Sequence, residues 1–146
     1  MSLKTNKIME LYEFKVSYRK KIEDKQVKVS ETYLLDALSY TEAESRATEK
    51  MQELINTNFN ISKISKVSYA DIFSETSGDR FYKVKVSLNY EDENGKMKKD
   101  NTLVLIKGDT VKDAYENLVV EYGDSIENYT IINIMESPVL DIFNYI

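Results

Sequence analysis

Six segments of the chain are predicted to be strands, and in several of them apolar and polar side chains alternate with the period of two expected of strands with one buried face. The alternation is most regular where Lys85 and Ser87 separate Val84, Val86 and Leu88. β-Branched and aromatic residues, which favour strands, are frequent in these segments. The predicted strands cover residues 12–20, 27–37, 59–69, 81–90, 97–107 and 129–135.

Two further segments have helical spacing. Thr41-Glu42-Ala43-Glu44 forms a capping box, in which the Thr41 hydroxyl accepts from a free amide and Glu44 reaches back. The second helix is predicted to begin near Asp109, a favourable N-cap, and to end at Gly123. The apolar stripes expected to face the core are Ala43, Ala47, Met51, Leu54 and Ile55 in the first helix, and Val111, Ala114, Tyr115, Leu118, Val119 and Tyr122 in the second.

Three positions indicate how the strands are connected. Asn94-Gly95 is a strong hairpin signal between the fourth and fifth strands. A charged turn near Glu23-Asp24-Lys25 serves the first two strands in the same way. Pro138 has no N–H to donate, so the chain there either forms a sheet edge or leaves the sheet.

The two halves of the chain resemble each other. Residues 12–75 align with residues 82–145 without gaps, with 14 identities in 64 positions. The shared motifs are YxxKVS, which begins at Tyr12 and Tyr82, and Asp-Ile-Phe near the end of each half. In the middle, the helical stripes match better at an offset of 68 residues than at 70. This pattern indicates an internal duplication.

We therefore expect an α+β fold of two tandem ββαβ repeats related by pseudo-two-fold symmetry, with helices packed on antiparallel sheet. One continuous sheet and two sheets packed face to face both fit the pattern. The chain is expected to form one compact domain overall. Its expected parts are a flexible tail or cloning remnant over 1–9, repeat 1 over 10–75, a polar linker over 76–80 and repeat 2 over 81–146.

Composition excludes several classes of chemistry. The 146 residues include no Cys and no His, which excludes disulfides, thiol catalysis, a Ser-His-Asp triad and imidazole-bound metal. The four glycines are isolated, so no phosphate-binding glycine loop is present. We therefore expect no enzyme activity, no metal and no cofactor. The absence of an 18-residue apolar run predicts no membrane span, and the absence of Cys fits a cytoplasmic location.

Charge is segregated by element, although the formal net charge is −5. The predicted helices are acidic, whereas the predicted strands over 12–21, 80–90 and 96–107 are basic. Side chains two apart share one face of a strand. A sheet face that combines lysines and tyrosines suits single-stranded nucleic acid, with phosphates on the cations and bases on the rings. The candidate binding residues are Lys15, Tyr18, Arg19, Lys83, Lys85 and Tyr90.

Simpler explanations exist for the same residues. Lysines on strands commonly protect sheet edges from pairing, and tyrosine is a good strand former with an amphipathic side chain. Asp71 and Asp141 occupy matching places in the two Asp-Ile-Phe motifs, where we expect them to cap terminal turns rather than to form an acid pair.

Three stretches resemble an uncharacterised domain-of-unknown-function family of Bacteroidetes and their phages. They are Tyr12-Glu13-Phe14-Lys15-Val16, the segment from Tyr33 to Arg46 that contains YLLDALSYTEAE, and Tyr69-Ala70-Asp71-Ile72-Phe73. The resemblance covers most of the chain. It implies a bacterial cytoplasm and a phage or mobile element as the setting, and it carries no activity or site residues.

The leading hypothesis is a non-catalytic, phage-related accessory protein that binds single-stranded nucleic acid. The first alternative is a structural or protein-interaction subunit that pairs with a protein partner, or as a homodimer, through strand edges. The second alternative is a small-ligand-binding or defence-modulating protein. A membrane is not an expected partner.

Overall fold

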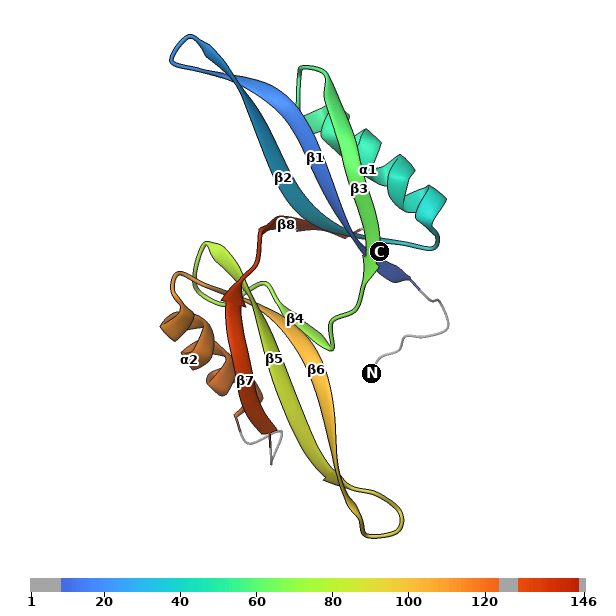
Figure 1. Cartoon of the computed structure of the whole chain (residues 1–146), viewed down its shortest axis with the longest axis vertical. Coiled ribbons are helices and arrows are strands. Elements are labelled where there is room, and N and C mark those ends of the chain that lie inside the picture. Colours follow the sequence, from blue (N-terminus) through green and yellow to red (C-terminus); the bar gives the residue numbers. More distant parts are fainter. Residues whose placement is uncertain (1–8, 124–128, 145–146) are drawn as a thin grey trace. The chain divides into compact units, whose positions relative to one another are not determined.

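The computed structural model describes residues 9–123 and 129–144 (Figure 1). The expected N-terminal tail therefore lies outside the described residues, except for Met9. The chain divides into two compact units. The first comprises the described residues up to Val67 together with those from Val139 onward, and the second is Ser68–Pro138. Within the described residues, each unit contains one helix and one four-stranded sheet, so the α+β class is confirmed, and the strands form two separate sheets.

The sheet of the first unit has the order β3-β1-β2-β8, and α1 lies against it (Figure 1). Strand β1 is antiparallel to both of its neighbours, whereas β8 pairs with β2 in parallel. The elements of this unit are β1 (Glu10–Ile22), β2 (Lys25–Ala37), α1 (Tyr40–Leu54), β3 (Phe59–Val67) and β8 (Val139–Phe143).

The sheet of the second unit has the order β4-β6-β5-β7, with α2 against it (Figure 1). Strand β5 is antiparallel to both neighbours, and β4 pairs with β6 in parallel. The elements are β4 (Asp71–Phe73), β5 (Arg80–Glu91), β6 (Met97–Gly108), α2 (Val111–Tyr122) and β7 (Tyr129–Glu136).

The short strands β4 and β8 were not among the strands predicted from alternation. Each contains an Asp-Ile-Phe motif, so Asp71 and Asp141 lie in strands rather than in the expected terminal turns. Antiparallel sheet had been expected. Because β4 and β8 each pair in parallel with their neighbours, both sheets are mixed instead. Pro138 lies just before β8, where the chain passes from the sheet that contains β7 to the sheet that contains β8.

Helix α1 begins two residues earlier than predicted. Ser39 is its N-cap, and the Ser39 hydroxyl accepts from the backbone N–H of Glu42 at 3.1 Å. The Glu42 carboxylate in turn accepts from the backbone N–H of Leu38 at 2.7 Å. Ser39 and Glu42 therefore form the capping interactions that had been assigned to Thr41 and Glu44, because the backbone is still extended at Ser39 and helical after it.

Helix α2 begins one residue later than predicted. The Thr110 hydroxyl, not the Asp109 carboxylate, accepts from the backbone N–H of Asp113 at 3.1 Å. Asp109 lies just before the cap, and its own N–H donates to the Asp113 carboxylate at 3.1 Å. The predicted stop at Gly123 is confirmed, since this residue is the C-cap with a φ of +46° that favours glycine.

Both predicted helical stripes are wider than the buried ones. Leu54 is exposed at the end of α1, and Val111, Tyr115 and Val119 are exposed on α2. The residues that do reach the cores are Ala43, Ala47 and Met51 in α1, and Ala114, Leu118 and Tyr122 in α2, while Ile55, the C-cap of α1, is half-buried and packs against the first core as predicted. These two sets lie 71 residues apart. The predicted offset of 68 is therefore wrong, because it paired the buried stripe of α1 with exposed residues of α2.

Each sheet packs its helix through one apolar face. In the first unit, Tyr12, Phe14 and Val16 of β1 lie in the same cluster as the buried residues of α1. In the second unit, Tyr82, Val84 and Val86 of β5 do the same with α2. The two units thus have separate hydrophobic cores, and the described helix of each unit lies on this one face of its sheet, so we call the opposite face helix-free.

Both predicted hairpins form. Strands β1 and β2 meet at Glu23-Asp24, whose φ values of 49° and 66° suit a tight two-residue turn. Strands β5 and β6 meet around Asn94-Gly95, where the Asp92 carboxylate accepts from the backbone N–H of Asn94 and of Lys96, both at 2.9 Å.

The segment predicted as a linker is held against the second unit. The Thr76 hydroxyl donates to the carbonyl oxygen of Lys107 at 2.9 Å and accepts from its N–H at 3.1 Å. Gly78 packs so closely on Gly108 that a Cβ atom would overlap the Gly108 backbone. Residues 76–80 therefore belong to the framework of this unit.

Candidate functional site

Strand β1 has two different faces, because successive side chains alternate across a strand. Tyr12, Phe14 and Val16 are buried toward α1. Lys15 and Arg19 have the opposite parity, so they lie on the helix-free face, where both are exposed. The sequence-based expectation that these two cations share a face of the sheet agrees with this placement.

The cross-strand neighbours of these two cations are also cations. Lys15 pairs with Lys63 of β3, and Arg19 pairs with Lys28 of β2. Like charges directly opposite each other destabilise a sheet. In the described part of the chain, none of the four has an ion-pair partner. We call Lys15, Arg19, Lys28 and Lys63 the basic face of the first sheet.

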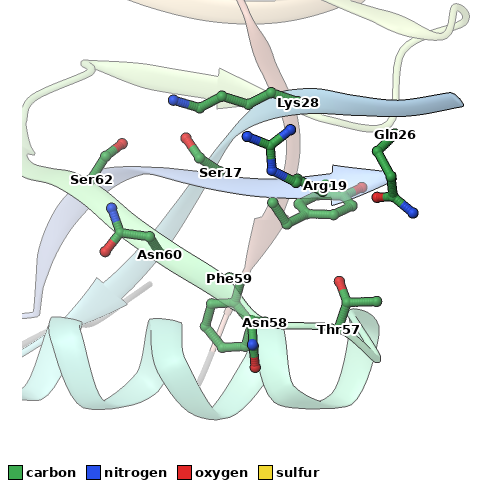
Figure 2. Close-up of a pocket in the computed structure, with 10 residues that line it drawn as sticks. Ser17, Arg19, Gln26, Lys28, Thr57, Asn58, Phe59, Asn60 and Ser62 are labelled. Carbon is green, nitrogen blue, oxygen red and sulfur yellow. The ribbon is translucent and has the colours of Figure 1, made fainter. Parts of the chain in front are cut away.

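A pocket of about 640 Å³ adjoins one end of the basic face (Figure 2). It lies where β3 begins, at Phe59 opposite Tyr18, and β1 continues beyond that pair to Ile22. The described residues that line it are two cations, seven neutral polar residues and one phenylalanine, and none of them is a carboxylate. The lining residues are Ser17, Tyr18, Arg19, Gln26, Lys28, Thr57, Asn58, Phe59, Asn60 and Ser62.

Tyr18 had been expected to lie on the same face as Lys15 and Arg19, where its ring could stack on a base. The structure places it on the opposite face. Its parity places it on the α1 side, where its hydroxyl donates to Oε2 of Glu31 at 2.9 Å. Tyr33 donates to Oε1 of the same carboxylate, also at 2.9 Å. Burial, followed by these contacts with Glu31, raises the pKa of both tyrosines. Tyr18 therefore reaches the pocket as a ring whose hydroxyl is already engaged.

The candidate residues of the second unit are arranged differently. Lys83 and Lys85 share the helix-free face of β5, but their partners on β6 are Leu105 and Leu103 rather than cations. Tyr90 is 48% exposed and has the opposite parity, so the structure does not bring it together with these lysines.

Sequence reasoning did not select Lys28, Lys63, Asn58 and Asn60 as site residues. Lys28 and Lys63 were visible as cations in predicted strands, but only the strand register shows that they face Arg19 and Lys15. Asn58 carries no signal of its own, since asparagine is common in the loops that precede strands.

Two further features of the described residues bear on function. Among the described residues, no group of three or more Asp and Glu side chains is placed to hold a metal ion. Neither described helix has the length and apolar character required to cross a membrane.

Comparison with known proteins identifies a family. A family model described as a domain of unknown function (DUF4494) matches residues 10–145. A search of curated proteins finds no match. Because the model covers almost the whole chain, the protein belongs to this family, which agrees with the resemblance to an uncharacterised family noted from the sequence.

Proposed function

We propose that this member of a family of unknown function is a non-catalytic binding protein that takes single-stranded nucleic acid on the basic face of the first sheet. One observation carries the proposal: Lys15 faces Lys63 and Arg19 faces Lys28, with no carboxylate paired to any of them in the described chain. An anion placed over each pair would offset the repulsion within it. A row of phosphates supplies such anions at successive positions.

The same residues favour a single strand over a duplex. Duplex binding depends on long-range attraction to phosphate, and the net charge of the chain is −5. Single strands expose their bases, which aromatic and amide side chains recognise. The pocket beside Arg19 carries such groups, among them Asn58, Asn60 and Phe59.

We further propose that the chain arose by tandem duplication of a ββαβ unit, with repeats over 10–75 and 81–146 and a pseudo-two-fold relation between them. The strand pairing in the two sheets supports a duplication. In the first sheet the register of β1 with β3 shifts between Lys15 and Val16, and in the second that of β5 with β7 shifts between Lys85 and Val86. The phage or mobile-element setting implied by the family resemblance is part of the same proposal.

The binding function can be tested by fluorescence anisotropy of a labelled single-stranded DNA 20-mer at 50 and 200 mM salt. We expect saturable binding that weakens steeply with salt. The double variant Lys15→Glu/Lys63→Glu should bind at least tenfold more weakly at 50 mM salt, because it replaces one opposed cation pair with carboxylates. Each lost phosphate contact should also flatten the slope of log K against log salt by about 0.7.

Lys83→Glu/Lys85→Glu is the matched control, because it changes the net charge equally within the other sheet. We expect it to keep most of the affinity. Absence of wild-type binding at 50 mM salt would overturn the proposal. Equal loss in both double variants would also overturn it, since binding would then follow total charge rather than the basic face.

A further inference from the structure

We infer that the pocket beside Arg19 and Lys28 is a nucleotide site, which binds one nucleoside 5′-monophosphate, either as a free molecule or as one unit of single-stranded nucleic acid. Binding of a unit within nucleic acid rests on the function proposed above, whereas binding of a free nucleotide does not. The pocket supports this inference because its lining combines two cations, Arg19 and Lys28, with several neutral polar side chains.

The two cations of the lining, Arg19 and Lys28, suit a phosphate. Arg19 of β1 and Lys28 of β2 are directly opposite each other on the helix-free face. A guanidinium binds phosphate through two parallel hydrogen bonds, and an ammonium adds a point charge. The Glu31 carboxylate of β2 lies toward α1 and already accepts from the hydroxyls of Tyr18 and Tyr33. In the described part of the chain, no carboxylate lines the pocket to compete for these cations.

The neutral polar side chains of the lining suit a base and a sugar. Gln26, Asn58 and Asn60 carry amides, each of which donates and accepts hydrogen bonds, as the edge of a base requires. Thr57 and Ser62 add hydroxyls that suit ribose. Figure 2 shows Asn60 and Ser62 on β3, on the same side as Ser17, with Thr57 and Asn58 toward the end of α1.

The apolar contribution is limited but well placed. Phe59 is half-buried, since it also packs against the core beneath α1. It therefore presents part of its ring to the pocket rather than a free face for stacking. The pocket volume of about 640 Å³ lies within the range of about 300–1,000 Å³ typical of small-molecule sites.

The second unit offers an internal comparison. Its ladder pairs Asn89 with Lys99 at the positions where the first unit pairs Arg19 with Lys28. One of the two cations is therefore missing. Ile132 stands at the irregular position of β7 that Ser62 occupies in β3, and it is half exposed. We therefore assign the nucleotide site to the first unit alone.

The test is a titration of the full ¹⁵N-labelled chain, followed by two-dimensional NMR. The ligands are the four common ribonucleoside 5′-monophosphates, inorganic phosphate and uridine. We expect at least one nucleotide to saturate, with shifts confined to the backbone amides of the lining residues. Inorganic phosphate and uridine should each bind at least tenfold more weakly than that nucleotide, because phosphate engages only the two cations and uridine only the neutral polar side chains.

Two variants separate the parts of the site. Arg19→Gln should lower nucleotide affinity at least tenfold, whereas Lys85→Gln, which removes one exposed cation from the other unit, should leave it within twofold. Asn60→Ala should weaken the nucleotide several-fold and leave inorganic phosphate unchanged. All three side chains are exposed, and the unperturbed amide spectrum of each variant would verify that it folds.

The outcomes distinguish the two proposals. If no nucleotide saturates the pocket while the DNA 20-mer binds the basic face, the nucleotide site is overturned and the proposed function stands. If nucleotides bind but the 20-mer does not, the proposed function is overturned and the site stands. If inorganic phosphate binds as tightly as every nucleotide, the pocket is an anion site without base recognition, and the inference fails.

Discussion

At the scale of single residues, neighbours in the chain have different roles. Tyr18 and Arg19 are adjacent, yet one donates to Glu31 on the α1 side and the other is exposed on the basic face. The cause is the two-residue period of the strand. The register then decides which residues meet: Lys28 faces Arg19, although eight residues lie between them. A binding site on a sheet is thus assembled from parity and pairing, not from proximity in sequence.

Tyr122 provides a prediction at this scale. Its buried hydroxyl donates to Asp71 at 3.2 Å, and burial followed by the Asp71 charge raises its pKa to about 12. Because the folded state favours the neutral phenol, the stability from this group is full below pH 10 and is lost as the pH rises through about 12. Tyr122→Phe keeps the ring but removes the titrating hydroxyl.

We therefore expect Tyr122→Phe to lose less stability than the wild type between pH 10 and pH 12. At pH 8 the variant should be less stable by about 1 kcal/mol, because it lacks one hydrogen bond. Urea unfolding at a series of pH values measures both effects. Tyr115→Phe, at an exposed position of α2, is the matched control. If the wild type and Tyr122→Phe have parallel pH profiles, the pKa assigned to Tyr122 is wrong.

At the scale of elements, the short strands contribute more to the packing of the cores than their length indicates. Strand β8 pairs with β2, about a hundred residues earlier in the chain. It brings Phe143 against Tyr33, with ring centroids 5.1 Å apart, and near Phe14 at 6.4 Å. The Asp-Ile-Phe motif is therefore an edge strand whose last residue anchors it to a core.

This anchoring gives a prediction for β8. Phe143→Ala should destabilise the first unit by about 2–4 kcal/mol, because it removes a half-buried ring from the aromatic cluster. Leu140→Ala, in the same strand but 55% exposed, should change stability by no more than about 0.5 kcal/mol. Chemical denaturation measures both variants. Equal effects of the two substitutions would show that β8 is not held by Phe143.

At the scale of the whole molecule, the chain is organised as two units with a core each. The second unit is one continuous segment, Ser68–Pro138, and the first is completed by residues from Val139 onward. The basic face and the nucleotide pocket belong entirely to the first unit. Binding and the stability of the second core should therefore be separable.

Leu118→Ala tests this separation. Leu118 is fully buried in the second core, so the substitution should cost about 2–5 kcal/mol there. We expect hydrogen exchange to accelerate in β5, β6 and α2, while β1–β3 keep their protection and the DNA 20-mer binds with unchanged affinity. Uniform loss of protection in both units would instead show that they unfold as one cooperative body.

Several features of the fold could be predicted from the sequence alone. Alternation and apolar runs rich in β-branched and aromatic residues indicated the six long strands, and the hairpins at Glu23-Asp24 and Asn94-Gly95 are where turn chemistry placed them. Both helices were found, with starts wrong by one or two residues at Ser39 and Thr110. These features depend on contacts between residues a few positions apart, and the local sequence contains all the partners.

Only the tertiary structure decided the rest. Which sheet β4 and β8 join, and in which direction, depends on the path of the chain between elements rather than on three to five local residues. The same holds for the site. The sequence identified Lys15 and Arg19 as candidate cations. Only the register of strand pairing shows that Lys15 lies opposite Lys63 and Arg19 opposite Lys28. Ladder hydrogen bonds join residues far apart in sequence, so no short-range pattern specifies them.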